Sequence, residues 1–143
     1  MKARSGFTLV EILIVVVILG ILAAIVIPQF TEASTEAKTS SLMTDLQTMR
    51  SQIELYKIQH NDLLPAATGE TEANFTARMT GQTDIAGNAG TDYGPYIQQI
   101  PQNQFTDLAT VEIDGTLGDG SHGWNFNTTT GAFHADDADH DHL

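Results

Sequence analysis

The sequence predicts an α+β fold in which a long N-terminal helix packs against a small C-terminal antiparallel β-sheet. Residues 7–28 are almost uniformly apolar, and residues 29–62 are amphipathic with a helical period. The last third of the chain alternates aromatic and β-prone residues with turns. These changes in pattern divide the chain into five segments, at residues 1–6, 7–28, 29–62, 63–135 and 136–143.

The apolar segment is long enough to cross a membrane. A helix rises about 1.5 Å per residue, so residues 7–27 span about 31 Å, close to the hydrocarbon thickness of a bilayer. Lys2 and Arg4 precede the segment, and the next basic residue is Lys38. This bias places the N-terminus on the cytoplasmic side. We therefore expect a single-pass membrane protein whose C-terminal part lies outside the cytoplasm.

One acidic residue, Glu11, interrupts the apolar segment near its outer edge. An ionised side chain at the centre of a spanning helix costs about 2.5 to 3.5 kcal/mol, and one turn from the edge it costs less but not zero. A helix that served only as a membrane anchor would have an apolar residue such as Leu at this position, so we expect Glu11 to be functional. The alternative is that Glu11 lies at headgroup depth without a role.

The run from Gly6 to Glu11, GFTLVE, with the apolar helix and Pro28 behind it, resembles the class III signal of type IV pilins and type II secretion pseudopilins. The resemblance implies that a membrane-embedded prepilin peptidase cuts between Gly6 and Phe7, removes the leader 1–6 and methylates the new N-terminus. It also implies that Glu11 meets the N-terminal ammonium of a neighbouring subunit during filament assembly.

Physical reasoning supports this pairing. Cleavage would place an ammonium on Phe7, four residues from Glu11, and a charge left unpaired in a low dielectric is costly. Pairing between chains satisfies both charges and fixes the stagger of neighbouring helices, as a buried polar residue fixes coiled-coil register. The competing interpretation is an ordinary signal peptide cleaved near Ala23 and Ala24, but such signals have apolar cores of about 7 to 15 residues.

Two residues are expected to weaken the long helix. Pro28 removes the hydrogen bond to the carbonyl of Ala24 and is expected to kink the helix there. Gly20 is a second weak point. The resemblance implies that filaments lose helical order between the matching glycine and proline.

The amphipathic segment predicts a helix over about residues 29–60, which Pro65 ends. Its apolar residues recur at steps of three and four and form one stripe, Leu42, Leu46, Met49, Ile53 and Tyr56. We expect this stripe to hold the C-terminal domain. The chain has no cysteine, and a domain this small is marginal alone, so the helix must supply one wall of its core.

The remaining domain, residues 63–135, predicts loops with a short helical turn at about 73–79, followed by three β-prone stretches. The stretches are 110–114, 123–127 and 131–135, and the last two flank a turn and predict a hairpin. The segment 92–105 resembles one in major pseudopilins, although it lacks the Pro-Trp-Gly that often comes next there.

Two clusters suggest metal binding. Asp114, Asp119 and Ser121 lie in the glycine-rich loop 114–123, and oxygen ligands on such a loop suit calcium. The resemblance also implies calcium, since major pseudopilins bind it near their C-terminus, but the loop is shorter than the family pattern and a plain turn is the other interpretation. The tail 136–143 has four Asp and two His and is expected to be solvated and disordered, with weak transition-metal chelation as the alternative.

Charge and motifs limit the possible functions. The net charge is −12 and becomes −14 when Lys2 and Arg4 are removed. Residues 61–143 contain Arg78 against thirteen acidic residues. This surface disfavours nucleic acid, since phosphate binding depends on Lys and Arg. No catalytic motif is found, so we expect no enzyme. A membrane-anchored binding module is a further alternative, but it does not explain Glu11 or the Gly6–Phe7 junction.

We therefore expect a structural subunit, closest to the G-type major pseudopilin, of a helical periplasmic filament of a type II secretion system. The resemblance implies a homopolymer that an inner-membrane platform and ATPase motor assemble together with minor pseudopilins. The alternative is the major subunit of a type IV pilus at the cell surface.

Overall fold

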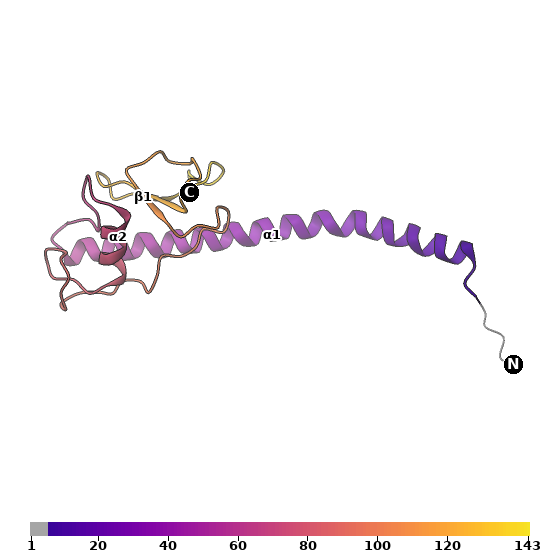
Figure 1. Cartoon of the computed structure of the whole chain (residues 1–143), viewed down its shortest axis with the longest axis horizontal. Helices are drawn as coiled ribbons and strands as arrows, with labels where there is room; N and C mark the ends of the chain where they lie inside the picture. The colour runs from indigo at the N-terminus through magenta and orange to yellow at the C-terminus, as the bar shows by residue number, and fades with distance from the viewer. Residues whose placement is uncertain (1–5) are drawn as a thin grey trace. The chain divides into compact units, whose positions relative to one another are not determined.

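The computed structural model describes residues 6–143. Figure 1 shows their helices and strands along the chain. Two helices and three strands are found in these residues: α1 Leu9–Gln59, α2 Glu72–Thr80, β1 Val111–Ile113, β2 Trp124–Phe126 and β3 Phe133–Ala135. The chain divides into two compact units, an N-terminal unit up to Ala37 and a C-terminal unit, Lys38–Leu143.

Helix α1 is helical at every residue from Leu9 to Gln59, including Gly20 and Pro28. Pro28 has no N–H to give to the carbonyl of Ala24. Just after it, Thr31 Oγ1 donates to the carbonyl of Ile27 at 3.2 Å, a side-chain bond of the kind that often bends helices. The predicted helix over 29–60 is confirmed, and the kink at Pro28 stays a prediction.

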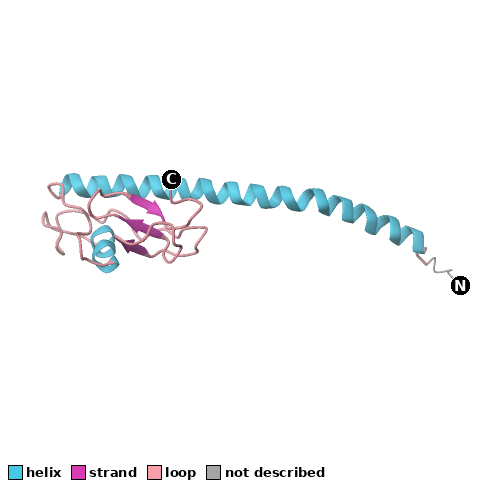
Figure 2. Ribbon diagram, turned by 90° about the horizontal axis from the view of Figure 1, so that it is seen from above, coloured by secondary structure: helices cyan, strands magenta, loops and turns pink. Residues whose placement is uncertain are grey.

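The C-terminal unit has its core along one face of α1. The predicted stripe is confirmed, since its five members are at most 1% exposed: Leu42, Leu46, Met49, Ile53 and Tyr56. They share one hydrophobic cluster with Phe75 of α2 and with aromatic residues of the sheet, Trp124, Phe126 and Phe133. Figure 2 shows the three strands side by side next to this part of α1. The helix therefore supplies one wall of the core.

The sheet has the order β1-β2-β3. Strands β2 and β3 form the predicted antiparallel hairpin, with Phe126 opposite Phe133. Strand β1, however, pairs with β2 in parallel, so the prediction of an antiparallel sheet is wrong for this pair. Parallel neighbours need a connection that returns the chain to the same end. The glycine-rich residues 114–123 make this return, with φ of +82° at Gly118 and +74° at Gly120.

The middle residues of the three strands are in register, Glu112 opposite Asn125 and Asn125 opposite His134. Because successive side chains of a strand point to opposite faces, these three lie on the face away from the core. Asn125 Nδ2 donates to Glu112 Oε2 at 3.4 Å across this face.

The tail 136–143 packs on the C-terminal unit, which corrects the expectation of disorder. Asp136 is completely buried, and its N–H donates to the carbonyl of Gly123 at 3.1 Å. The ring of His140 stacks on Phe105 with centroids 4.0 Å apart. The tail keeps its order because its first residue extends the pairing of β3 and its histidine finds an aromatic partner.

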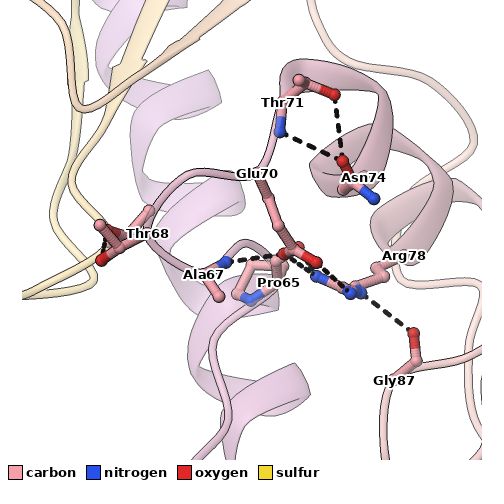
Figure 3. Close-up of polar contacts among 9 residues, drawn as sticks. Pro65, Ala67, Thr68, Glu70, Thr71, Asn74, Arg78 and Gly87 are labelled. Carbon is pink, nitrogen blue, oxygen red and sulfur yellow. Dashed lines mark hydrogen bonds and ion pairs between the residues drawn. The ribbon is translucent and has the colours of Figure 1, made fainter.

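Helix α2 confirms the helical turn predicted at 73–79 and carries a polar clasp, shown in Figure 3. Arg78 makes a two-pronged ion pair with Glu70, in which Nη2 donates to Oε1 at 2.8 Å. Its Nε donates to the carbonyl of Gly87 at 3.0 Å, and its Nη1 to that of Pro65 at 3.2 Å. Glu70 also accepts from the N–H of Ala67 at 2.8 Å. The clasp ties two loops to α2.

Candidate functional site

The N-terminal part of α1 exposes its apolar side chains. From Leu9 to Ile27 every large hydrophobic side chain is exposed, from 42% at Val26 to 82% at Leu9. An 18-residue window of this helix has a mean hydropathy of 3.3 and is not buried in the chain at all. By length and composition the helix fits membrane anchoring. Its apolar surface requires lipid or another protein chain to cover it.

Glu11 lies in the first turn of this exposed helix, where its carboxylate is held by Thr8. Its Oε2 accepts from the N–H of Thr8 at 2.7 Å and from Thr8 Oγ1 at 2.8 Å. In return, the N–H of Glu11 donates to Thr8 Oγ1 at 3.2 Å. This reciprocal pattern is a capping box, which satisfies N–H groups that have no partner inside the helix.

The capping box means that Glu11 has hydrogen-bond partners within its own chain. The negative charge is also favourable at this position because the N-terminal end of a helix carries a partial positive charge. We did not predict this capping role of Glu11 from the sequence. The signal was available in the spacing, since Thr8 and Glu11 match the Ser/Thr-x-x-Glu pattern of a capping box.

The junction between Gly6 and Phe7 lies just before α1, in residues without regular secondary structure. The side chain of Phe7 is 82% exposed, and a Cβ added at Gly6 would meet nothing within 4 Å. Exposed, non-helical chain is where proteolytic cleavage concentrates. The expected leader residues 1–5, which include Lys2 and Arg4, lie outside the described residues.

The three calcium candidates have other partners in the structure. Asp114 accepts from the N–H of Thr128 at 2.8 Å and from its hydroxyl at 2.5 Å. Asp119 Oδ1 accepts from the N–H of Ser121 at 2.8 Å. Hydrogen bonding from Ser121 holds the pKa of Asp119 below its ordinary value. Asp119 therefore caps the turn in which it lies and also interacts with the side chain of Asp136, whereas Asp114 bonds to Thr128 in the turn after β2.

A different group of metal-ligating side chains comes together in the residues that the structure describes. Glu112, His122 and Asp136 each offer one ligand atom, and these atoms lie within 4.8 Å of one another. Calcium takes six to eight oxygen ligands, whereas this group offers two carboxylates and an imidazole. An imidazole nitrogen is not among the ligands that calcium takes. Sequence reasoning missed the group because its members come from β1, the loop after it and the tail.

The chain is similar to known proteins at its N-terminus and over most of its length. Residues 1–27 match the family model described as the prokaryotic N-terminal methylation motif. A fimbrial protein of Pseudomonas aeruginosa is 31% identical over 121 residues, covering 85% of this chain and 73% of that protein. No solved structure is significantly similar to the chain.

Proteins of one secretion system are also among the relatives. The type II secretion system core protein G of Klebsiella pneumoniae is 30% identical over 105 residues, covering 73% of this chain and 71% of that protein. The protein of the same name in Pseudomonas aeruginosa is 42% identical over 59 residues, covering 41% of this chain and 42% of that protein.

Proposed function

The chain belongs to the family of type IV pilins and type II secretion pseudopilins, and we propose that it is the major pseudopilin of a type II secretion system. In this role it is the structural subunit that repeats along a helical periplasmic filament. The observation that carries the proposal is the exposed apolar surface of α1 from Leu9 to Ile27, with one carboxylate, Glu11, near its edge. The relatives are structural proteins, and no catalytic role is proposed.

Assembly begins in the membrane. The helix from Leu9 lies in the inner membrane, with the N-terminus on the cytoplasmic side and the C-terminal unit in the periplasm. Prepilin peptidase cuts the exposed bond between Gly6 and Phe7 and methylates the new N-terminus. The cut creates an ammonium one turn from Glu11, and both charges are then costly to keep unpaired in a low dielectric.

Incorporation into the filament exchanges the partner of Glu11. The carboxylate, held by Thr8 in the separate chain, takes the ammonium of a neighbouring subunit instead. A hydrogen bond to an ionised donor is roughly twice as strong as a neutral one, so the exchange is favourable where water is excluded. Only one axial stagger brings the two charges together, which sets the register. Such head-to-tail contacts do not close and therefore propagate a helix.

The exposed apolar residues of α1 become buried in the same step, as the chain joins the filament. Side chains that face lipid in the membrane pack against the helices of neighbouring subunits in the filament core. Gly20 and Pro28 lie within this segment and provide the sites at which the filament helix yields under tension. An inner-membrane platform, an ATPase motor and minor pseudopilins complete the machine, since this chain has no nucleotide-binding motif.

A second candidate function is the major subunit of a type IV pilus at the cell surface. The similarity to a fimbrial protein over 85% of this chain favours it. The two functions differ in the machinery that assembles the chain. Expressing the chain with either a secretion or a pilus assembly system, and looking for filaments by electron microscopy, separates them.

The test of the proposal is Glu11→Ala, with Glu32→Ala as the matched control because Glu32 is also an exposed glutamate of α1. Glu11→Ala is expected to be cleaved and inserted into the membrane but to form no homopolymer, because the neighbour's ammonium loses its partner. Glu32→Ala is expected to form filaments in normal number. Normal filaments from Glu11→Ala would contradict the proposal.

A further inference from the structure

The carboxylate of Asp136 is buried and, among the described residues, has no Lys or Arg paired with it. It is 0% exposed, and its two oxygens accept from the N–H groups of Gly118 at 2.9 Å and His122 at 3.1 Å. Within residues 6–143, no Lys or Arg forms an ion pair with it. Buried charges in proteins are normally paired or coordinate a metal. Each oxygen of Asp136 also keeps a lone pair beyond its N–H bond.

Two further carboxylates lie beside the first: that of Glu112, with ligand atoms within 4.8 Å, and that of Asp119, which interacts with the Asp136 side chain. Glu112 is the middle residue of β1, and Asn125 Nδ2 donates to its Oε2. A Cβ at Gly115 would lie 1.8 Å from the carboxyl carbon of Glu112, so a glycine there makes room for this placement. Two negative charges so close repel each other. The arrangement calls for a cation.

The third member, His122, is oriented by its neighbour. Ser121 Oγ lies 2.8 Å from Nδ1 of the ring. When Nδ1 carries the proton and donates to this hydroxyl, Nε2 keeps a free lone pair, which is the form in which histidine binds metals. A hydrogen bond of this kind on the other ring nitrogen is the usual support of a metal-ligating histidine.

We propose that Glu112, His122 and Asp136 bind a divalent transition-metal ion of the zinc class, in place of calcium. Imidazole with carboxylates suits zinc and its neighbours, whereas calcium takes oxygen ligands alone. In a tetrahedral zinc site with ligands about 2.1 Å from the ion, ligand atoms lie about 3.4 Å apart. The ligand atoms here lie within 4.8 Å of one another, so side-chain rotations that bring them about 1.4 Å closer give the group this size. The fourth position is open to water.

Such an ion would join three separate parts of the C-terminal unit. Glu112 lies in β1, His122 in the loop that returns the chain to β2, and Asp136 just after β3. The carbonyl of Asp136 also accepts from the N–H of Gly120 in this loop at 2.8 Å. Binding of the ion therefore stabilises the parallel β1–β2 connection and the tail together.

The experiment is calorimetric titration of zinc chloride into the untagged full chain in detergent, after EDTA treatment and removal of the EDTA. Wild type is compared with His122→Gln and with His142→Gln, since His142 is exposed and has no place in the group. We expect one zinc ion per chain, an affinity at least tenfold lower for His122→Gln, and a change of less than about twofold for His142→Gln. Zinc should raise the melting temperature of wild type by mass action.

Three results would overturn the proposal: no zinc binding by wild type, unchanged binding by His122→Gln, or calcium binding at least as tight as zinc. If His122→Gln does not fold, Glu112→Gln takes its place with the same expected tenfold loss. The readouts do not involve polymerisation, so their outcome is independent of the proposed filament function.

Discussion

The two ends of helix α1 contain the same kinds of apolar residue but bury them in different ways. Leu46, in the C-terminal unit, is 1% exposed, whereas Leu19, in the N-terminal unit, is 58% exposed. The difference comes from the rest of the chain, because residues 66–135 fold onto one end of the helix and supply its partners. One end therefore builds the core of a domain, and the other leaves its apolar side chains exposed.

The free energy gained by burying apolar side chains shows why the exposed end of the helix needs other molecules. Full burial of one Leu, Ile or Val side chain is worth about 1.5 to 3 kcal/mol. Residues 9–27 present many such side chains to the surroundings, and none of this energy is available to the separate chain in water. In the proposed function, lipid provides it before assembly and neighbouring subunits provide it afterwards.

The largest expected effect separates the two ends directly. Leu46→Ala should lower the free energy of unfolding of the C-terminal unit by about 2 to 5 kcal/mol, because it leaves a cavity in the core. Leu19→Ala, the same change on the exposed end, should alter it by less than about 0.5 kcal/mol. Urea unfolding in detergent, followed by the fluorescence of Trp124, measures both. Equal losses of unfolding free energy from the two variants would contradict the distinction between a buried and an exposed end of the helix.

The next effect tests whether polar contacts also hold the C-terminal unit together. Arg78→Ala removes four hydrogen bonds that join α2 to two loops, and we expect a loss of about 1 to 3 kcal/mol. Lys57→Ala is the control, since Lys57 lies 3.9 Å from Glu54 in a partly exposed pair and its loss should cost less than about 0.5 kcal/mol. The same urea unfolding compares them. A similar loss of unfolding free energy from Lys57→Ala would show that removing any positive charge destabilises the unit, and that the hydrogen bonds of the clasp are not the cause.

The smallest effect is a pH dependence that belongs to the C-terminal unit. The hydrogen bond from Arg78 holds the pKa of Glu70 below its ordinary value of 4.5. The stability that ionised Glu70 gives the folded chain is therefore fully present above pH 4.5. It is lost as the pH falls through the lowered pKa of Glu70 in the folded state. Melting temperatures measured from pH 6 to pH 2 should fall less steeply for Glu70→Gln than for wild type. An unchanged slope in Glu70→Gln would assign the acid sensitivity to other groups.

Local sequence predicts some parts of the C-terminal unit and not others. Periodicity predicted the buried stripe from Leu42 to Tyr56, and turn residues predicted the hairpin of β2 and β3. The pairing of β1 was not predictable in this way, because the direction of a three-residue strand depends on the path of the loop after it. The prediction for the tail was wrong because its composition is polar, while its order comes from the distant partners Phe105 and Gly123.

The candidate sites also differ in whether local sequence predicts them. The GFTLVE run indicated the processing junction and Glu11 because the signal lies in consecutive residues. The Arg78 clasp and the group of Glu112, His122 and Asp136 each join residues far apart in sequence, so only the folded chain reveals them. Residue type and the glycine-rich loop made Asp114 and Asp119 calcium candidates, and that site stays a prediction; in the structure they accept hydrogen bonds from Thr128 and Ser121.

The central claim is that Glu11 exchanges Thr8 for the ammonium that cleavage creates on a neighbouring chain. Mass spectrometry of the N-terminal peptide from assembled filaments tests it most directly, because the exchange requires a free amine at Phe7. We expect a peptide that begins at Phe7 and carries one methyl group. Filaments whose subunits still begin at Met1 would lack this amine and would contradict the account.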